Sequence, residues 1–107
     1  MRIIARSTLR KFVKSLAGRS DQRAVSAALD AWFHEVRRAR WQNAADVKRS
    51  YATASIVAAD RVVFNIKGNA YRLVAAVDFE KHAVWIVWLG SHEDYDKIDA
   101  STVRYGI

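Results

Sequence analysis

The spacing of apolar residues changes at residue 61, and this change limits the fold more than any other feature of the chain. Apolar residues recur at helical spacing before it and in short runs after it, namely "RVVFNI", "YRLVAAVDF" and "AVWIVWLG". The connections "KGN" and "EKH" are so short that consecutive strands must be antiparallel neighbours. Residues 61–90 are therefore predicted to form three antiparallel strands.

The first half is predicted to hold one strand and two helices. The β-branched "RIIA" (residues 2–5) is typical of a short strand, and Ser7 can cap a helix that is closed by Gly18. Ser20 and Asp21 begin a longer helix, whose apolar stripe consists of Val25, Ala28, Leu29, Trp32, Phe33 and Val36. Residues 41–57 give the least clear pattern, and only a short helical turn followed by a loop is predicted there.

A final short helix is predicted after Ser91, which can act as a helix cap and is followed by acidic residues. The predicted order is β-α-α-β-β-β-α, an α+β fold in which the helices pack on one face of a small antiparallel sheet. The chain has 107 residues and no visible linker, so we expect a single domain over residues 1–107.

The charge of the chain indicates a polyanionic partner. It carries 18 Lys and Arg against 11 Asp and Glu, a net charge of +7, and its pI is near 10.1. The excess lies in residues 1–50, where twelve basic and four acidic side chains leave +8. A nucleic acid is the simplest such partner, whereas the alternative is that the basic helix faces are simply solvated.

Several classes of function are excluded by composition. Cysteine is absent, which rules out disulfides, thiolate metal ligands and a cysteine nucleophile. No apolar run approaches the ~18 residues of a membrane span, and the first residues do not resemble a signal peptide. No pair of histidines and no set of histidine and acidic residues shows metal-ligand spacing, apart from the ordinary acids of the predicted final helix. We therefore expect an intracellular protein without a metal site or membrane contact.

The hairpin "FNIKGNAYRLVAAVDF" sets two polar residues side by side among buried ones. If Gly68 and Asn69 form a type II′ turn, residue 66 pairs with 71 and Asn65 faces Arg72. The core face then holds Val62, Phe64, Ile66, Tyr71, Leu73 and Ala75. A hydrogen bond between Asn65 and Arg72 on a solvated face would be the plainest explanation of the pair.

The next strand returns to the same end of the sheet and brings His92 close to Arg72. His92, Tyr95 and Asp96 share one face of the last helix by their i, i+3 and i+4 spacing. One rim of the sheet is therefore predicted to gather Asn65, Lys67, Asn69, Arg72, His92 and Tyr95. Arginine can hold a phosphate, histidine can move a proton, and tyrosine can stack on a base, which together suit RNA cleavage.

Each of these residues also has a structural alternative. Asn69 is a common turn residue, Tyr95 could anchor the last helix, and His92 could make a structural hydrogen bond. Other aromatic and imidazole side chains are assigned no role in chemistry. We expect Tyr71 in the core, Trp88 under the helices, Trp85 on a partner surface, and His34 and His82 as incidental.

Residues 61–99, "RVVFNIKGNAYRLVAAVDFEKHAVWIVWLGSHEDYDKID", resemble the HigB branch of the RelE superfamily of toxins from bacterial toxin–antitoxin pairs. The likeness rests on "FN-I-x-GN-x-YRL", a strand of aromatic and aliphatic residues, and "G-S-H-x-x-YDKID", with Ser91 where the family is expected to have threonine. The segment "ADVKRSYATASIV" with Lys48 extends it to residues 45–99.

The resemblance implies a RelE-like fold and a cytoplasmic, ribosome-dependent endoribonuclease that cuts messenger RNA in the ribosomal A site without a metal or other cofactor. It implies three partners: the ribosome, messenger RNA and a helix-turn-helix antitoxin of the HigA type. The expected catalytic residues are Arg72, His92 and Tyr95. RNA binding is expected of Asn65, Lys67, Asn69 and Lys48, and ribosome binding of Arg37, Arg38 and Arg40.

Two other functions explain part of the pattern. A non-catalytic RNA-binding module would use the same rim and the same charge, but it would tolerate replacement of His92 by glutamine. A protein-interaction domain would account for Trp85 but not for the high pI.

Overall fold

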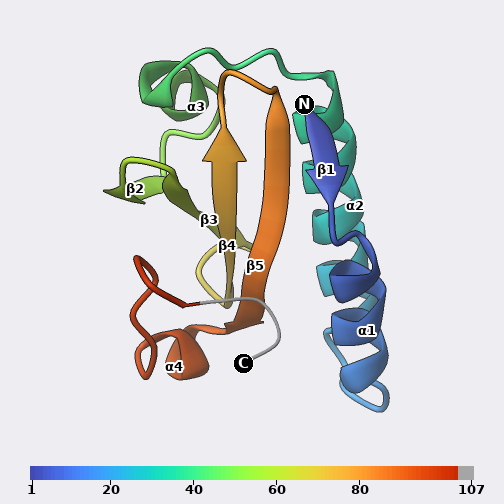
Figure 1. Ribbon diagram of the computed structural model, residues 1–107. Coiled ribbons are helices and arrows are strands. Elements are labelled where there is room, and N and C mark those ends of the chain that lie inside the picture. The colour runs from blue at the N-terminus through green and yellow to red at the C-terminus, as the bar shows by residue number, and fades with distance from the viewer. Residues whose placement is uncertain (104–107) are drawn as a thin grey trace.

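The computed structural model describes residues 1–103, which form a five-stranded sheet and four helices (Figure 1). The strands are β1 (Arg2–Ile4), β2 (Ser55–Ala58), β3 (Arg61–Ile66), β4 (Tyr71–Asp78) and β5 (Ala83–Ser91). The helices are α1 (Ser7–Ser15), α2 (Gln22–Arg38), α3 (Ala44–Ser50) and α4 (His92–Tyr95). The predicted α+β class is confirmed.

The sheet is mixed, not purely antiparallel as predicted. Its strand order is β1-β5-β4-β3-β2, and β2 to β5 form antiparallel neighbours as their short turns require. The first strand instead pairs in parallel with β5, so that Ile3 lies opposite Val84. This arrangement is possible because the whole helical half separates β1 from the other strands, and parallel neighbours need such a long connection.

The segment from residue 41 to residue 57 is more ordered than predicted. Asn43 caps α3 by accepting a hydrogen bond from the Asp46 amide at 3.0 Å, while the Asp46 carboxylate accepts one from the Gln42 amide at 2.9 Å. The segment then adds β2 to the edge of the sheet, with an irregularity between Ile56 and Ala58. A four-residue strand interrupted by a register shift shows no alternation that sequence analysis could detect.

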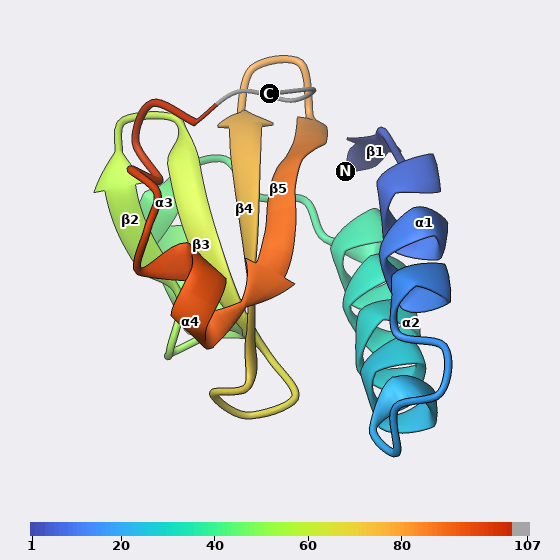
Figure 2. The same cartoon turned by 90° about the horizontal axis from the view of Figure 1, so that it is seen from below.

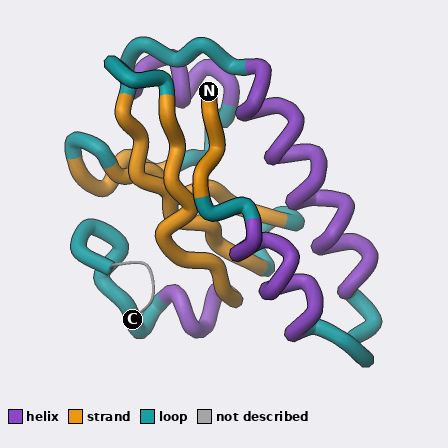
Figure 3. The backbone as a smooth tube through the Cα atoms, turned by 45° about the vertical axis from the view of Figure 1, so that its right-hand side comes forward, coloured by secondary structure: helices purple, strands orange, loops and turns teal. Residues whose placement is uncertain are grey.

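Helices α1 and α2 pack side by side and cover one face of the sheet (Figure 3). The apolar stripe predicted for α2 is confirmed, since Val25, Leu29, Trp32, Phe33 and Val36 are all buried. They pack against a strand face that includes Val62, Phe64, Ile66, Tyr71, Leu73, Ala75 and Ile86, the face predicted for the hairpin.

The other face of the sheet is covered by α4 and the segment that follows it, so the helices do not all lie on one face as predicted. Figure 2 shows α4 over the strands and well apart from α1 and α2. A second apolar cluster there joins Val63, Val74 and Val87 to Tyr95, Ile98, Ala100 and Val103. Arg61 ties the segment down, because its Nη1 donates to the carbonyls of Ala100 (3.2 Å) and Val103 (2.6 Å).

Trp88 belongs to this second cluster, which corrects the prediction that it lies under the helices. The reason is a bulge in β5: Val74 pairs with Trp88, but the next residue of β4, Ala75, pairs with Ile86. Val87 is therefore an extra residue, and the strict alternation on which the prediction relied is shifted beyond it.

The helix ends are only partly as predicted. Ser7 lies inside α1, where no side-chain cap is formed, and Asp21 at the start of α2 does not cap it either. Gly18 closes the first helix with a left-handed φ of +86°. Ser91 caps α4 as predicted, since its hydroxyl accepts from the Asp94 amide at 3.1 Å.

Candidate functional site

The hairpin between β3 and β4 has the predicted register. Asn65 pairs with Arg72 and Ile66 with Tyr71. Gly68 has a φ of +62°, and the Ala70 amide donates to the Lys67 carbonyl at 3.2 Å, which closes the turn. Lys67 is also left-handed, with a φ of +51° that is unfavourable for a lysine. The turn thus holds an exposed cation in a strained backbone conformation.

Asn69 joins the two polar residues of the hairpin. The Arg72 Nη1 donates to the carbonyl of Asn69 at 2.8 Å and to that of Tyr71 at 3.2 Å. The Asn65 amide donates to the side-chain oxygen of Asn69 at 3.3 Å. Within residues 1–103 no side-chain hydrogen bond joins Asn65 to Arg72, so the expected bond between the two side chains is replaced by contacts through the turn. Asn69 therefore orients both side chains.

His92 lies at the same rim, as predicted. Its backbone amide donates to the Ala70 carbonyl at 3.0 Å, which continues the pairing of Arg72 with Gly90 and Tyr71 with Ser91. The imidazole is about half exposed, at 52%, and its Nε2 lies 3.9 Å from a carboxylate oxygen of Asp96. The backbone of the hairpin thus fixes where α4 starts, while the imidazole remains accessible to a ligand.

Tyr95 has a packing role and also borders the site. Its ring lies 6.2 Å from the ring of Trp88, centroid to centroid, and the Arg72 guanidinium carbon lies 5.9 Å from the Tyr95 centroid. Trp88 in turn covers Gly90, where a Cβ would lie only 2.5 Å from the indole ring. The absence of a side chain at Gly90 therefore allows Trp88 to support Tyr95 at the rim.

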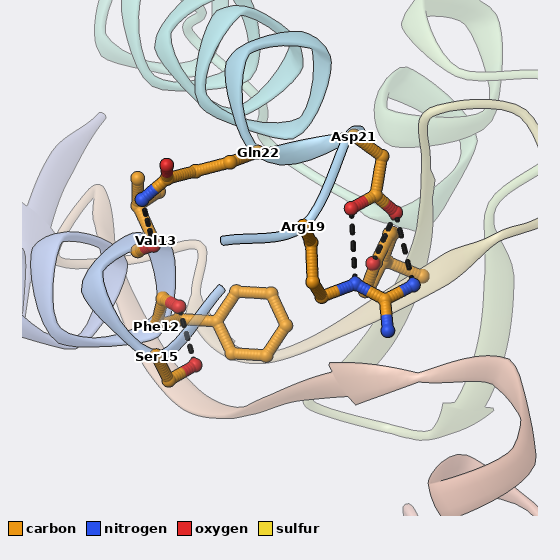
Figure 4. Close-up of polar contacts among 7 residues, drawn as sticks. Phe12, Val13, Ser15, Arg19, Asp21 and Gln22 are labelled. Atoms are coloured by element: carbon orange, nitrogen blue, oxygen red, sulfur yellow. Dashed lines mark hydrogen bonds and ion pairs between the residues drawn. The ribbon is translucent and has the colours of Figure 1, made fainter. Parts of the chain in front are cut away.

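An ion pair that was not predicted from the sequence lies beside this rim. An open hollow of about 620 Å³ is lined by Arg19, Asp21, Asn69, Ala70, Tyr71, Ser91, His92 and Glu93. In it Asp21 accepts a hydrogen bond from the Arg19 Nε at 3.0 Å (Figure 4). Asp21 also accepts one from the Tyr71 hydroxyl at 2.6 Å. The charged run "GRSD" between the predicted helices was the available signal, but its contact with β4 spans 50 residues of sequence.

Ionisation of Asp21 is favoured by these partners. The hydrogen bond from Arg19, followed by that from Tyr71, lowers the pKa of Asp21 to about 2. Burial raises the pKa of Tyr71, as does its hydrogen bond to Asp21, so the phenol stays protonated and keeps donating. Tyr71 is buried as predicted, at 4% exposure, but its hydroxyl reaches the edge of the site.

The remaining predicted residues lie elsewhere. Lys48 is on α3, at the end of the sheet away from α4 (Figures 1 and 3), and its ammonium donates to the carbonyls of Ala52 (2.8 Å) and Ala54 (2.6 Å). Arg37 and Arg40 line an open groove of about 990 Å³ near the start of β1, whereas Arg38 lies outside its lining. The other cationic side chains of the groove are Arg2, Arg6 and Lys81, together with the N-terminal amine and His82.

Two structural findings bear on cofactors and membranes. Across residues 1–103, no three histidine or acidic side chains gather in a way that could hold a metal ion. None of the helices in this described range combines the length and the apolar character needed to cross a membrane.

A small mixed sheet covered by helices is consistent with a RelE-like fold. A family model described as HigB_toxin, the RelE-like toxic component of a toxin-antitoxin system, matches residues 25–98. The chain belongs to this family, which confirms the resemblance inferred from residues 45–99. It is therefore a toxin of a toxin–antitoxin system, and an antitoxin partner follows from that membership. No curated protein matches the chain in sequence.

Proposed function

We propose that this toxin is a ribosome-dependent endoribonuclease that cleaves messenger RNA in the ribosomal A site and thereby stops translation. The observation that carries the proposal is the convergence of Arg72, His92 and Tyr95 at one exposed rim, in a chain of a RelE-like toxin family. These are an anion-binding fork, a proton carrier and an aromatic ring, the groups that RNA cleavage requires.

The proposed reaction is an attack of the ribose 2′-hydroxyl on the neighbouring phosphorus. A bond forms between the 2′ oxygen and phosphorus, and the bond from phosphorus to the 5′ oxygen breaks. The 2′ proton leaves to a base and the departing 5′ oxygen gains a proton, so the products are a 2′,3′-cyclic phosphate and a 5′-hydroxyl. This balance requires no metal and no other cofactor.

In this proposal Arg72 binds the scissile phosphate and offsets the charge that develops on it. One of its nitrogens is already bonded to the Asn69 carbonyl, so the guanidinium is held in place before RNA arrives. His92 transfers a proton to or from a ribose oxygen, and Tyr95 stacks on a base or donates to the phosphate. Asn65, Asn69 and Lys67 support RNA at the turn. Lys48, on α3 at the other end of the sheet, is proposed to bind RNA outside the rim.

The proposed partners are the ribosome and an antitoxin, in addition to messenger RNA. Of the three arginines expected to bind ribosomal RNA, Arg37 and Arg40 lie in the open groove, which within residues 1–103 is lined by cations and by no acidic side chain. Arg38 lies outside this lining and is proposed to contribute less. The antitoxin is proposed to be a helix-turn-helix protein of the HigA type. Since the substrate is messenger RNA on translating ribosomes, the site of action is the cytoplasm.

The test is cleavage of a messenger by purified protein, with and without translating ribosomes, as a function of pH. Arg72→Lys keeps the charge but loses the planar fork, so we expect a loss of about 10²-fold or more in rate. His92→Gln should remove the dependence of the rate on pH that a proton-transferring imidazole imposes. Arg49→Lys is the control, because Arg49 is an exposed arginine of α3 paired with Asp46.

Three outcomes would decide against parts of this proposal. Efficient cleavage of naked RNA would contradict ribosome dependence. An Arg72→Lys variant that cleaves at the parent rate would remove Arg72 from the reaction. A failure to cleave under either condition, with RNA binding retained, would favour the non-catalytic RNA-binding module. A thermal melt of each variant shows whether it is folded.

A further inference from the structure

The rim continues into the hollow that contains Arg19. Asn69 belongs to both, because its carbonyl accepts from Arg72 while the residue also lines the hollow. His92 likewise starts α4 at the rim and lines the hollow. A strand of RNA that lies on Arg72 and His92 can therefore continue across Asn69 toward the loop between α1 and α2.

Arg19 is held in a fixed orientation at the far side of this path. Its Nε and Nη2 donate to the two oxygens of Asp21 at 3.0 and 3.3 Å. Such a two-point contact fixes the plane of the guanidinium. Asp21 is itself fixed by the hydroxyl of the buried Tyr71 at 2.6 Å.

The outer edge of Arg19 remains open to a ligand. The side chain is 61% exposed although it is bonded at two nitrogens. Figure 4 shows that its third nitrogen, Nη1, points away from Asp21 and takes no part in the hydrogen bonds to that carboxylate. A solvated fork of fixed orientation that faces a hollow is suited to one phosphate oxygen.

We propose that Arg19 binds the RNA phosphate adjacent to the scissile one. The inference rests on the proposed function and extends its site from the rim to the loop between α1 and α2. Arg72 and Arg19 then grip consecutive phosphates, one from β4 and the other from that loop. Tyr71, the neighbour of Arg72 in β4, links the two through Asp21 and acts as a positioning residue.

The binding of RNA at Arg19 depends on the orientation of the guanidinium more than on its net charge. Asp21 neutralises the Arg19 guanidinium in part, and Glu93 adds a second carboxylate to the hollow. A lysine at position 19 would keep the charge but could not bond Asp21 at two points and still present a donor to RNA. Arg19→Lys is therefore expected to bind RNA no better than Arg19→Gln.

The test measures binding of a 2′-O-methyl trinucleotide that has two phosphate linkages and no terminal phosphate. The 2′-O-methyl group removes the nucleophile, so binding is measured without cleavage. Each linkage in turn is replaced by a neutral methylphosphonate of similar size. In the parent protein each replacement should weaken binding by about tenfold, the effect of one charge-assisted hydrogen bond.

The variants should show which of the two linkages each arginine binds. In Arg19→Gln one neutral linkage no longer weakens binding, and in Arg72→Gln the other no longer does. Arg49→Gln, which loses an equivalent exposed pair with Asp46 on α3, should respond to both linkages like the parent. Tyr71→Phe should reduce the effect at the Arg19 linkage in part, with the Arg72 linkage unchanged.

The proposal is wrong if both linkages still matter in Arg19→Gln, or if neither matters in the parent protein. It is also wrong if Arg19→Lys retains the full effect. These outcomes are separate from the fate of the proposed function. If the protein shows the divided pattern but cleaves no messenger, the Arg19 subsite stands and the proposed nuclease activity is wrong. If the protein cleaves messenger but its RNA binding is insensitive to Arg19, the nuclease activity stands and the subsite is wrong.

Discussion

Asp21 illustrates how a single side chain can connect parts of the chain that are far apart in sequence. It precedes α2, where an aspartate usually caps the helix, but its oxygens are already bonded to Arg19 and Tyr71. Capping requires that the side chain turn back toward the helix amides. The two external donors prevent this, and the result is a link between the α1–α2 loop and β4.

The ionisation of Asp21 should make the stability of the folded protein depend on pH in the acidic range. Because its pKa is lowered in the folded protein, from 3.8 to about 2, the charged form stabilises the fold above pH 3.8 and this contribution is lost as the pH falls toward 2. Asp21→Asn should therefore flatten the decrease of Tm in that range. Thermal melts at successive pH values measure it, with the exposed Asp30→Asn as control; equal slopes in both variants would contradict the link.

At the residue scale, the sequence predicted which residues lie opposite each other more accurately than it predicted their side-chain hydrogen bonds. The alternation of β3 and β4 was sufficient to place Asn65 opposite Arg72, because the side-chain period of a strand leaves only one register with an apolar core. It could not predict that both would bond to Asn69, since that depends on rotamers and on the turn. Lys48 gave no signal that its ammonium would be bonded to nearby carbonyls.

At the scale of single elements, the bulge in β5 decides the shape of the rim. It sends both Val87 and Trp88 to the face covered by α4. The indole of Trp88 then occupies the space over Gly90, directly before α4 begins. Sequence patterns describe regular strands, so the irregular strand β5 was less predictable than β3 and β4. The short elements α3 and β2 were missed for a similar reason.

Gly90→Ala should displace α4. The added Cβ would lie 2.5 Å from the Trp88 ring, so the indole must move and lose its contact with Tyr95. We expect a destabilisation of about 1–3 kcal/mol, typical of overpacking, and a loss of any activity that uses His92 and Tyr95.

Urea unfolding of Gly90→Ala, Trp88→Leu and the double variant measures this coupling. Because Trp88→Leu removes the clash, the alanine should cost much less in that background than in the parent. If the two substitutions add without interaction, the indole does not explain why residue 90 is a glycine.

At the scale of the whole molecule, cations gather at two ends of a body 40 Å long. The groove with Arg37 and Arg40 lies where α2 ends, and the rim with Arg72 lies at the opposite end of the sheet (Figure 1). Charge counting predicted the excess in residues 1–50 but not that it would collect in a groove. That arrangement depends on the parallel pairing of β1 beside α2, which no local pattern reveals.

Three nearly adjacent arginines allow the groove to be tested separately from the rim. Arg37→Gln and Arg40→Gln should each weaken ribosome binding and reduce its salt dependence by about one unit, as expected for one lost phosphate contact. Arg38→Gln is the matched control, since Arg38 is exposed but lies outside the groove and should have a smaller effect. Equal effects of the three would indicate that only the overall charge matters.

The pairing of β1 with β5 also determines when the sheet can be completed during synthesis of the chain. The first strand leaves the ribosome early, but its hydrogen-bonding partner begins only at Ala83. Contacts between such distant segments form late and slowly. His92 follows β5 directly, so the rim does not exist in a partly made chain. A ribosome that makes this protein therefore carries a chain that lacks the proposed site until β5 and α4 have emerged.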